Sequence, residues 1–561
     1  MESSMTKRCS TTDSAFYWKL FLSSVVLFLG CSQRFSSQEK AASDQVRPRR
    51  EKTGFIIRLV ADDGTEKRDK EEKFDPPDRV IAAVEEREPK VIAAVEEHEP
   101  QKTASVDFET RNGKIFSNWE KPKTTIVFSG MLDGYIEPCG CAGLDNQKGG
   151  VSRRHSLIRE LQSKGWPVIS LDLGGMVQRT GPQAAIKYQR LIAAHQILGY
   201  DAIGLGAHDL KLPTETLLAQ LSQDKPSPFV TANVVSIFDD DFGLTARYRV
   251  IDSGGLRIGV TQVLGEKYGN DLQNPDFQYQ PPSEAMPPVI KQLKAEKCDL
   301  LFLLANASVA EARKMAEEFT AFDFVVVAGD SDPPPPQPET SKDTSTQLIE
   351  LGHKGMYVGV LGVYSHPQRH FLYQRVPLDG RFSGSQEMVA MLAAYQDQLK
   401  EQGLAGLGVR AIGHPSGHQF VGSAACEECH SEEYAIWEET PHAHAMETLI
   451  QLSTPRSFDP ECISCHVTGW EPQEHYPFAS GYESMAKTPH LAGMGCENCH
   501  GGGAKHVAAE NELSDEAELE QRRAEMRLTL EQAKNHACAN CHDLDNSPSF
   551  DFDKYWPEVE H

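Results

Sequence analysis

Short apolar runs alternate with amphipathic segments between residues 124 and 377. Runs of this length predict strands, and we expect six of them, at residues 125–128, 168–173, 202–205, 257–261, 300–304 and 324–328. Residues 152–164 and 184–198 carry apolar side chains at helical spacing. Strands that alternate with helices are typical of a layered α/β domain, which we place at residues 122–380.

The segments before this domain have a different pattern. Residues 1–31 combine three basic residues with an apolar run at 20–29, which indicates an export signal and is too short for a membrane span. Gly30 before Cys31 also fits a lipoprotein signal, in which Cys31 carries the lipid anchor. Residues 32–121 are polar and charged, contain an 11-residue duplication at 80–90 and 91–101, and predict a disordered linker.

The segments after the α/β domain are expected to be mostly helical. A helix is predicted at residues 386–402, within a linker that we bound at 381–415. The last domain, residues 416–561, holds eight of the 13 cysteines, and 13 of the 20 histidines lie after residue 410. Thiols and imidazoles are the groups that metal chemistry needs, so this domain is the expected functional centre.

The eight cysteines form four CXXCH motifs. They are Cys426, Cys429 and His430; Cys462, Cys465 and His466; Cys496, Cys499 and His500; and Cys538, Cys541 and His542. Each thiol pair can form two thioethers to haem vinyl groups, and the adjacent histidine then binds the iron. The sequence therefore predicts four covalently bound haem c groups packed in a helical domain.

Zinc and disulfides are the alternatives for paired cysteines. The CXXC pairs of zinc ribbons are about 15–20 residues apart, closer than these, and zinc does not require a histidine after every pair. Disulfides within CXXC pairs are reactive and leave the histidines without a role. Both alternatives are weaker than haem.

The sixth ligands of the four irons are less defined, because nine other histidines lie in this region. We expect His442, His444 and His506 as distal ligands, and Met446, Met485 and Met494 compete with them. Methionine ligation raises the potential of a haem relative to a second histidine, so this choice sets the place of the protein among electron carriers.

Residues 418–542 resemble the tetrahaem cytochrome c-554 family. The resemblance is carried by the sequence VGSAAC at 421–426, by Trp437 followed by His442, by CHVTG at 465–469 and by GCENCHG at 495–501. It implies closely stacked haems, mostly with two axial histidines, and sometimes one haem left open for a small ligand. The family's CHGPG sequence is CHGGG here, at 499–503.

The α/β domain resembles the calcineurin-like metallophosphoesterases of the 5′-nucleotidase type, in which Asp, His and Asn bind two metal ions. The order of the motifs matches, at LDGY 132–135, LDLGG 171–175, GAHD 206–209, LANAS 304–308 and GDSD 329–332. Most ligand positions hold other residues, namely Met131, Asp133, Gly175, Ala207, Asn306, Asp330 and Asp332, and only His208 is retained. A two-metal site needs ligands on both ions, and Met131, Gly175 and Ala207 cannot supply them. The resemblance therefore implies a phosphoesterase fold without phosphoesterase activity.

Two other chemistries stay open in this domain. Asp133, Asp172, Asp209, Asp330 and Asp332 offer oxygen ligands for calcium or magnesium, although loop aspartates more often cap helices or face solvent. Cys139 and Cys141 form a CXC pair that could be a disulfide, a metal site or a catalytic thiol, and an oxidising compartment favours the disulfide.

The formal charge of −25, from 81 acidic and 56 basic residues, argues against nucleic-acid binding and fits a cationic redox partner. We expect an exported periplasmic or cell-envelope electron carrier. The alternative is a multihaem oxidoreductase that acts on a small nitrogen or oxygen compound at one open haem.

Overall fold

The computed structural model describes residues 107–139, 147–222, 227–238, 244–366, 369–512, 515–544, 546–547 and 550–561. The predicted export signal, Cys31 and the duplicated segment lie outside these residues. Within the described residues, no helix combines the length and the apolar character needed to cross a membrane.

Two mixed sheets form the centre of the α/β domain. The first contains, in spatial order, β15 (Arg369–Pro377), β14 (Tyr357–His366), β1 (Thr124–Ser129), β4 (Val168–Asp172) and β5 (Ala202–Ile203). The second contains β12 (Glu339–Thr340), β13 (Gln347–Glu350), β11 (Phe324–Val327), β10 (Leu300–Asn306), β8 (Leu256–Leu264) and β7 (Arg249–Ser253). The central neighbours β1 and β4 are parallel, as are β8, β10 and β11.

The space between the two sheets is an apolar core. Phe128 of β1 and Phe302 and Leu304 of β10 belong to it and are buried. Val127 and Leu303, which alternate with them in sequence, face the outer helices instead. Successive strand residues point to opposite faces, and both faces of these strands are covered, which explains their continuous apolar sequences.

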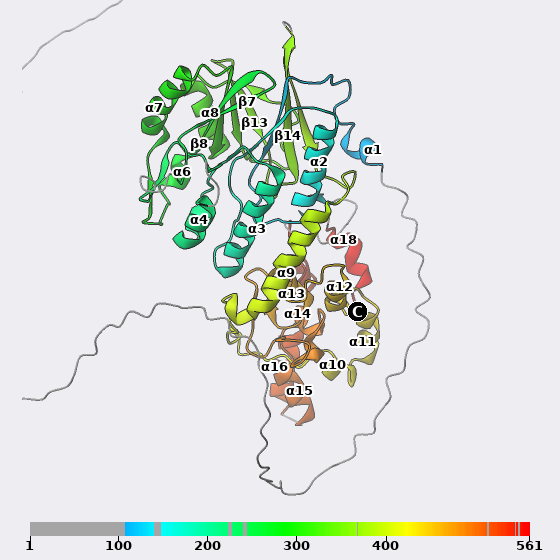
Figure 1. Cartoon of the computed structure of the whole chain (residues 1–561). Coiled ribbons are helices and arrows are strands. Elements are labelled where there is room, and N and C mark those ends of the chain that lie inside the picture. Colours follow the sequence, from blue (N-terminus) through cyan, green and yellow to red (C-terminus); the bar gives the residue numbers. More distant parts are fainter. Residues whose placement is uncertain are drawn as a thin grey trace, which may run out of the picture. The chain divides into compact units, whose positions relative to one another are not determined.

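Helices cover the outer face of each sheet (Figure 1). The helices α2 (Val151–Ser163), α3 (Pro182–Leu198) and α9 (Gln386–Gly406) share one core with the first sheet, and α7 (Pro282–Ala295) and α8 (Val309–Glu318) share another with the second. This order of helix, sheet, sheet and helix confirms the predicted layered α/β fold. The six predicted strands and the three predicted helices are present, with shifted ends.

Shorter elements connect these layers. They are η2 (Asp209–Lys211), α4 (Thr214–Leu221), α6 (Glu266–Gly269), and the strand pairs β2 (Pro138–Cys139) with β3 (Lys148–Gly149) and β6 (Val234–Ser236) with β9 (Phe277–Tyr279).

Residues 107–121 fold against the α/β domain, in contrast to the predicted linker that extends to residue 121. The helix α1 (Phe108–Asn112) is capped by the Asp107 carboxylate. Phe116 is buried, and its ring centroid lies 5.2 Å from that of Trp119 and 5.7 Å from that of Trp166. The burial of these aromatic rings outweighs the polar composition of the segment.

The C-terminal region consists mostly of short helices, as predicted. They are α10 (Ala424–Glu427), α11 (Ser431–Glu438), α12 (Ala445–Gln451), α13 (Pro460–His466), η3 (Pro489–Leu491), α14 (Cys496–His500), α15 (Ala504–Asn511), α16 (Glu516–Met526), α17 (Leu530–Gln532), η4 (Ala533–Ala537), α18 (Phe552–Tyr555) and η5 (Trp556–Glu558). The strands β16 (Trp470–Glu471) and β17 (Tyr476–Pro477) form a small hairpin. The apolar cluster of this region is small, with Met446, Leu449, Ile463, Val467, Trp470, Tyr482 and Leu491 as its buried members.

A buried ion pair connects β4 to α3. The Asp172 carboxylate accepts hydrogen bonds from His195 Nε2 at 3.0 Å and from the backbone amide of Gly174 at 2.8 Å, and it also bonds to the Ser129 hydroxyl. The side chains of Asp172 and His195 are completely buried. Burial alone raises the pKa of Asp172, but the neighbouring His195 and these donors outweigh it and hold the pKa below its ordinary value. The carboxylate therefore stabilises the fold at neutral pH and loses this contribution as the pH falls through its lowered pKa.

The variant His195→Phe should keep the ring contact with Tyr200 but leave the buried Asp172 carboxylate without its hydrogen bond to His195 Nε2. We expect the free energy of unfolding to fall by about 3–5 kcal/mol at pH 7. Without His195, burial raises the pKa of Asp172, so the loss should be smaller at pH 4, where the carboxyl is protonated. Urea unfolding of the wild type and the variant at pH 7 and pH 4 measures the loss in the free energy of unfolding. The double variant Asp172→Asn/His195→Phe should lose the pH dependence, and equal losses for His195→Phe at both pH values would contradict the assignment.

Candidate functional site

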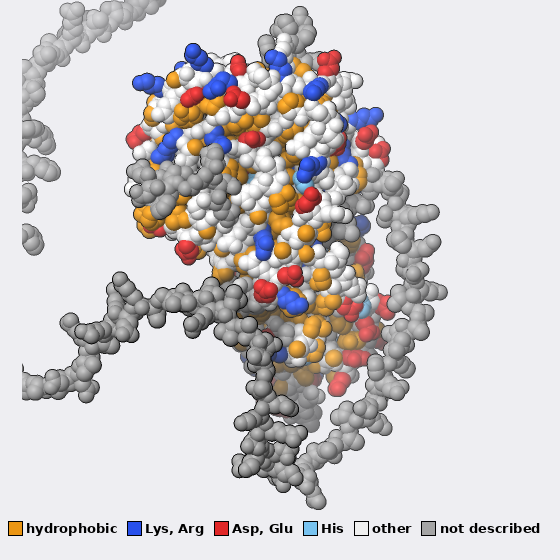
Figure 2. Space-filling view, in the orientation of Figure 1, with side chains coloured by type: hydrophobic (Ala, Val, Ile, Leu, Met, Phe, Trp, Pro, Cys, Tyr) orange, Lys and Arg blue, Asp and Glu red, His pale blue; other side chains and the backbone are white. Residues whose placement is uncertain are grey.

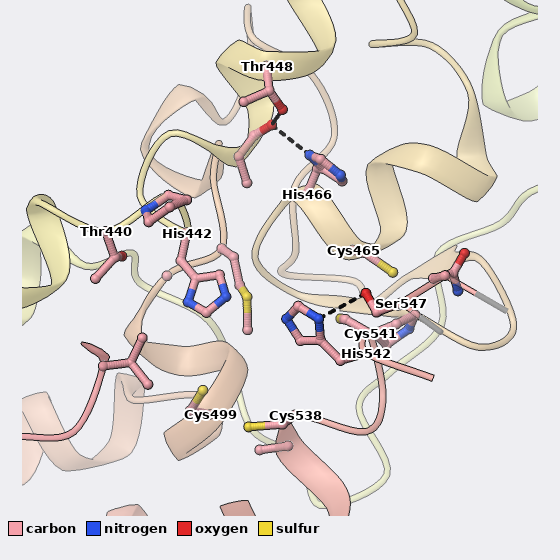
Figure 3. Close-up of a pocket in the computed structure, with 18 of the residues that line it drawn as sticks. Thr440, His442, Thr448, Cys465, His466, Cys499, Cys538, Cys541, His542 and Ser547 are labelled. Carbon is pink, nitrogen blue, oxygen red and sulfur yellow. Dashed lines mark hydrogen bonds between the residues drawn. The ribbon is translucent and has the colours of Figure 1, made fainter. Parts of the chain in front are cut away.

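One cavity of about 2240 Å³ is lined by all four CXXCH motifs. Its walls include the eight motif cysteines and the four motif histidines. Pockets for one small molecule usually have volumes of about 300–1000 Å³, so this cavity has room for several groups of that size. Figure 3 shows part of it, with Cys465, Cys499, Cys538 and Cys541 around one space.

Short helices place the two thiols and the imidazole of a motif on one side of the helix. Pro460 occupies the first turn of α13, and the Asp459 carboxylate caps it. The residues Cys462, Cys465 and His466 then follow at helical positions i, i+3 and i+4, which share one face. The third motif is α14 itself, and Gly501, with φ of +84°, ends that helix in a conformation that favours glycine.

The four motifs form a connected series within the cavity. The side chains of Cys426 and Cys496 are within hydrogen-bonding reach of each other, which joins the first motif to the third. The Cys465 and Cys541 side chains join the second motif to the fourth in the same way. Cys499 lies close enough to Cys538 for their charges to interact, and these two side chains are neighbours in Figure 3. The motifs are therefore adjacent in the order first, third, fourth and second.

Three motif histidines have one ring nitrogen fixed by a hydrogen bond. His466 Nδ1 lies 2.6 Å from the Ala445 carbonyl oxygen, and His500 Nδ1 lies 2.8 Å from that of Met526. A carbonyl oxygen can only accept, so Nδ1 carries the hydrogen and Nε2 is left as an electron-pair donor. His542 Nδ1 lies 3.0 Å from the Ser547 hydroxyl (Figure 3). Metal-binding histidines are usually oriented by such a partner.

Three motif histidines each face a second histidine across the cavity. The ring centroids are 6.4 Å apart for His430 and His506, 5.8 Å for His500 and His561, and 6.1 Å for His542 and His442. Metal–imidazole bonds are about 2 Å long, so two imidazoles on opposite sides of one ion have centroids roughly 6 Å apart. The three pairs therefore fit axial ligation of three irons.

The second motif has a different environment. Among the described residues, His466 makes no ring contact with another histidine. His475 also lines the cavity, but it lies beside Glu461, Arg179 and Lys187, and it too has no ring contact within the described part of the chain.

The structure brings His442 and His506 to the cavity but not His444. The His444 side chain is 53% exposed, and its Nε2 lies 3.1 Å from the Glu438 carbonyl oxygen. Of the three competing methionines, Met446 is in the apolar cluster, Met485 is exposed and Met494 lines the cavity. Sequence reasoning missed His475 and His561, because no local spacing connects either of them to a motif.

Burial favours the neutral form of five cavity imidazoles. It lowers the pKa of His442 to about 4, with a contribution from His542 and His466, and it lowers that of His475 to about 4. Burial also lowers the pKa values of His466, His500 and His542. A neutral imidazole has the free electron pair that an iron ligand needs.

Four of the motif positions of the α/β domain lie together, namely Met131, Gly175, Ala207 and Asn306. The Asn306 amide nitrogen lies 3.3 Å from Met131 Sδ, and the Asn306 side-chain oxygen is 3.4 Å from the Ala207 amide nitrogen. A Cβ added at Gly175 would lie 2.4 Å from Met131 Sδ and 3.2 Å from Met131 Cα. The absence of a side chain at position 175 therefore makes room for Met131.

The aspartates of this domain have structural partners or face solvent. Asp209 is buried and accepts backbone hydrogen bonds from Gly175, Val177 and Gly206, and its burial raises its pKa to about 6. The Asp133 carboxylate lies 3.2 Å from His353 Nδ1, and Asp330 and Asp332 are exposed. In the described part of the chain, no group of three or more His, Cys, Asp or Glu side chains is placed to hold a metal ion.

The predicted CXC pair cannot be described further. Cys141 and the side chain of Cys139 lie outside the described residues.

The α/β domain contributes to the wall of the cavity. Its loop at residues 133–138 lines the cavity together with Arg179 and Lys187. Arg179 donates a hydrogen bond to the Gln473 carbonyl at 2.9 Å, and Glu137 forms an ion pair with Arg456. These residues follow β1 and β4, at the edge of the first sheet where the phosphoesterase motifs lie.

Comparisons with known proteins match the C-terminal region and the α/β domain to two different kinds of protein. Residues 425–501 match the family model "Cytochrome c554 and c-prime". This segment is a cytochrome c554 domain. A 97-residue stretch is 33% identical to cytochrome c-554 of Nitrosomonas europaea and covers 15% of this chain and 39% of that protein. The fourth motif, at 538–542, follows the segment that the family model matches.

The central region is similar to 5′-nucleotidases, which confirms the resemblance found in its motifs. The snake venom 5′-nucleotidase of Gloydius brevicauda is 27% identical over 191 residues, which are 33% of this chain and 32% of that protein. The 5′-nucleotidase of Vibrio vulnificus is 29% identical over 169 residues, 28% of this chain and 30% of that protein. The chain thus spans about a third of the length of the curated relatives it matches.

Solved structures of the same kind also align with this chain. The 5′-nucleotidase precursor of Thermus thermophilus has a TM-score of 0.43 and 20% identity, and the alignment covers 50% of this chain and 59% of that one. The calcineurin-like phosphoesterase YfkN of Bacillus subtilis has a TM-score of 0.39 and 17% identity, and covers 49% and 97%.

The three facing pairs predict the distal ligands of the cytochrome c554 region. We expect His506→Ala, His561→Ala and His442→Ala each to convert one low-spin haem to a high-spin haem in the electron paramagnetic resonance spectrum, because each removes one axial imidazole. His444→Ala, which alters an exposed histidine of the same region, should leave the spectrum unchanged. A high-spin signal in His444→Ala, or none in the other three variants, would refute these pairings.

The contact between Gly175 and Met131 predicts a coupled effect on stability. Gly175→Ala should lower the free energy of unfolding by about 1–3 kcal/mol more than Gly255→Ala, because Gly255 has the same φ of +79° but open space around it. Combining Gly175→Ala with Met131→Ala should recover this excess. Urea unfolding followed by circular dichroism gives the free energy of unfolding of the wild type, the two glycine variants and the double variant. If Gly175→Ala and Gly255→Ala are equally destabilising, Met131 does not occupy that space.

Proposed function

We propose that this chain is an exported tetrahaem c-type cytochrome that transfers single electrons, with the α/β domain as a catalytically inactive scaffold. The observation that carries the proposal is the cavity lined by all eight motif cysteines and all four motif histidines. Haem attachment supplies a redox group with its own chemistry, and the chain supplies the thioether thiols, the axial imidazoles and the surroundings that set the potentials.

The arrangement of the motifs supports electron transfer through the protein. Adjacent motifs in the order first, third, fourth and second give a path from one end of the cavity to the other. The first motif lies beside exposed acidic residues on α10 and α11 and at their C-terminal ends, namely Glu427, Glu428, Glu432, Glu438 and Glu439. Red side chains gather at this position in Figure 2. They favour a cationic redox partner, which would exchange electrons at the first motif.

The filled metal position supports the absence of phosphoesterase activity. Hydrolysis by this fold requires two metal ions held by oxygen and nitrogen ligands. Here Met131 and Asn306 contact each other at that position, and the Asp172 carboxylate is engaged by His195, Ser129 and the Gly174 amide. The same observation makes the calcium or magnesium alternative weaker.

Export and membrane attachment complete the proposal. The basic and apolar pattern of residues 1–31 supports export to the periplasm or cell envelope, an oxidising compartment in which disulfides persist. Cys31 would attach the protein to the membrane as a lipidated residue, and residues 32–106 would serve as the tether.

One observation favours a second function. His466 has no facing histidine among the described residues, whereas the other three motif histidines do. A haem at the second motif with no sixth ligand would bind a small nitrogen or oxygen compound, which would make the protein a multihaem oxidoreductase.

Haem loading and spin state test both functions in one preparation. We expect the mass of the purified full chain to correspond to four covalently bound haems, and absorption spectra with and without carbon monoxide to show how many are open. Four low-spin haems that do not respond to carbon monoxide support the carrier, whereas one responsive haem supports the oxidoreductase. A Cys462→Ser/Cys465→Ser variant, which removes the second motif, should abolish any such response. Fewer than four haems, or zinc in their place, would refute the tetrahaem proposal.

A further inference from the structure

A buried polar network joins the α/β domain to the start of the second motif. Asp459, which caps α13, is 5% exposed. Its carboxylate accepts hydrogen bonds from the Gln183 side chain of α3 at 2.8 Å and the Gln396 side chain of α9 at 3.0 Å. Two helices of the α/β domain thus hold the cap of the helix that carries Cys462, Cys465 and His466.

Lys187 adds a charge to this network. Its ammonium group forms an ion pair with Glu461, the residue directly before Cys462. The side chains of Lys187 and Glu461 are only 13% and 28% exposed, and both line the cavity. The Lys187 charge also interacts electrostatically with Cys462. A lysine of the α/β domain therefore lies beside the attachment point of the second haem.

The pair stays charged despite its burial. Burial acts to raise the pKa of Glu461, but Lys187 outweighs it and holds that pKa below its ordinary value. Burial likewise acts to lower the pKa of Lys187, but Glu461 and Asp459 raise it. Breaking such a pair on one side leaves an uncompensated charge in a poorly solvated place.

The other charges near the second motif do not replace Lys187. Arg456 pairs with Glu137. Arg179 bonds to the Gln473 carbonyl, and its charge also acts on Glu461, but less strongly than that of Lys187. The charge of Asp543, in the loop of the fourth motif, acts on Cys465, and the charge of Asp459 acts on Glu461. Loss of the Lys187 charge would therefore leave an excess of carboxylates at this motif.

We propose that Lys187 is a positioning residue for the second haem, which holds Glu461 and α13 in place and sets the potential of that haem. The inference rests on the proposed tetrahaem function. An oxidised haem has one more positive charge than a reduced one, so an unpaired Glu461 carboxylate would favour the oxidised form and lower the midpoint potential. The α/β domain thereby acts on electron transfer without any hydrolytic chemistry.

Redox titration of the full chain, followed by haem absorption, tests this role. In Lys187→Met we expect one of the four midpoint potentials to fall, with about a tenfold change in the equilibrium between oxidised and reduced haem, or about 59 mV for a one-electron couple. Lys187→Arg should keep the wild-type value. Lys164→Met, which removes a surface lysine paired with Glu160 in the same domain, is the matched control and should move none. The variant Cys462→Ser/Cys465→Ser lacks the second motif and should therefore show three midpoint potentials. The potential that it lacks should be the one that falls in Lys187→Met.

The partner residue provides a second and independent measurement. Glu461→Gln should raise the same potential, and Lys187→Met/Glu461→Gln should return it close to the wild-type value. If Lys187→Met does not accumulate as a folded protein, the rise in Glu461→Gln decides the question alone. The proposal is overturned if none of the potentials moves or if all four move together. Mass spectrometry of each variant before titration separates this outcome from a failure of the tetrahaem function, which would appear as a missing haem in the wild type.

Discussion

Short helices with few buried apolar residues cannot hold a domain together by their own packing. The C-terminal region consists mostly of such helices, so its fold needs apolar surface from another source. Its apolar cluster has seven buried members, whereas the α/β domain has three much larger clusters. A cavity of about 2240 Å³ lies where a core would otherwise be. Haem groups attached at the motif thiols would supply the missing apolar surface, so the positions of the thiols would determine the fold as well as the chemistry.

In the α/β domain, the side chains at the phosphoesterase-like motifs contact one another and the backbone around them. Met131 and Gly175 fit each other, because a side chain at position 175 would occupy the space of the Met131 sulfur. Asp172 keeps its place at the end of β4, but its carboxylate now pairs with the buried His195. Asp209 accepts three backbone hydrogen bonds from the loops that would surround the metals. Hydrogen bonds within the protein thus satisfy the polar groups that remain.

The parts of the structure that the sequence predicts are those set by local spacing. The CXXCH spacing predicts the thiols and the proximal histidines, and the strand pattern predicts the buried β1, β4, β8, β10 and β11. The helix α7 was not predicted, because Pro287 and Pro288 interrupt its pattern. The distal pairs depend on tertiary structure. His506 faces His430 and His561 faces His500, across more than 60 residues in each case, and no spacing rule distinguishes these histidines from the exposed His444.

The contacts between the two domains lie at one edge of the first sheet. In open α/β sheets, the loops after the strands are where ligands bind, because they gather polar groups at one edge. Here the loops after β1 and β4, with the first half of α3, carry Glu137, Arg179 and Lys187 to Arg456, Gln473 and Glu461 of the C-terminal region. These contacts are charged or hydrogen-bonded and have fixed geometry, so they orient α13 more specifically than an apolar surface would. The edge of the first sheet that carries the phosphoesterase-like motifs therefore contacts the C-terminal region beside the second CXXCH motif.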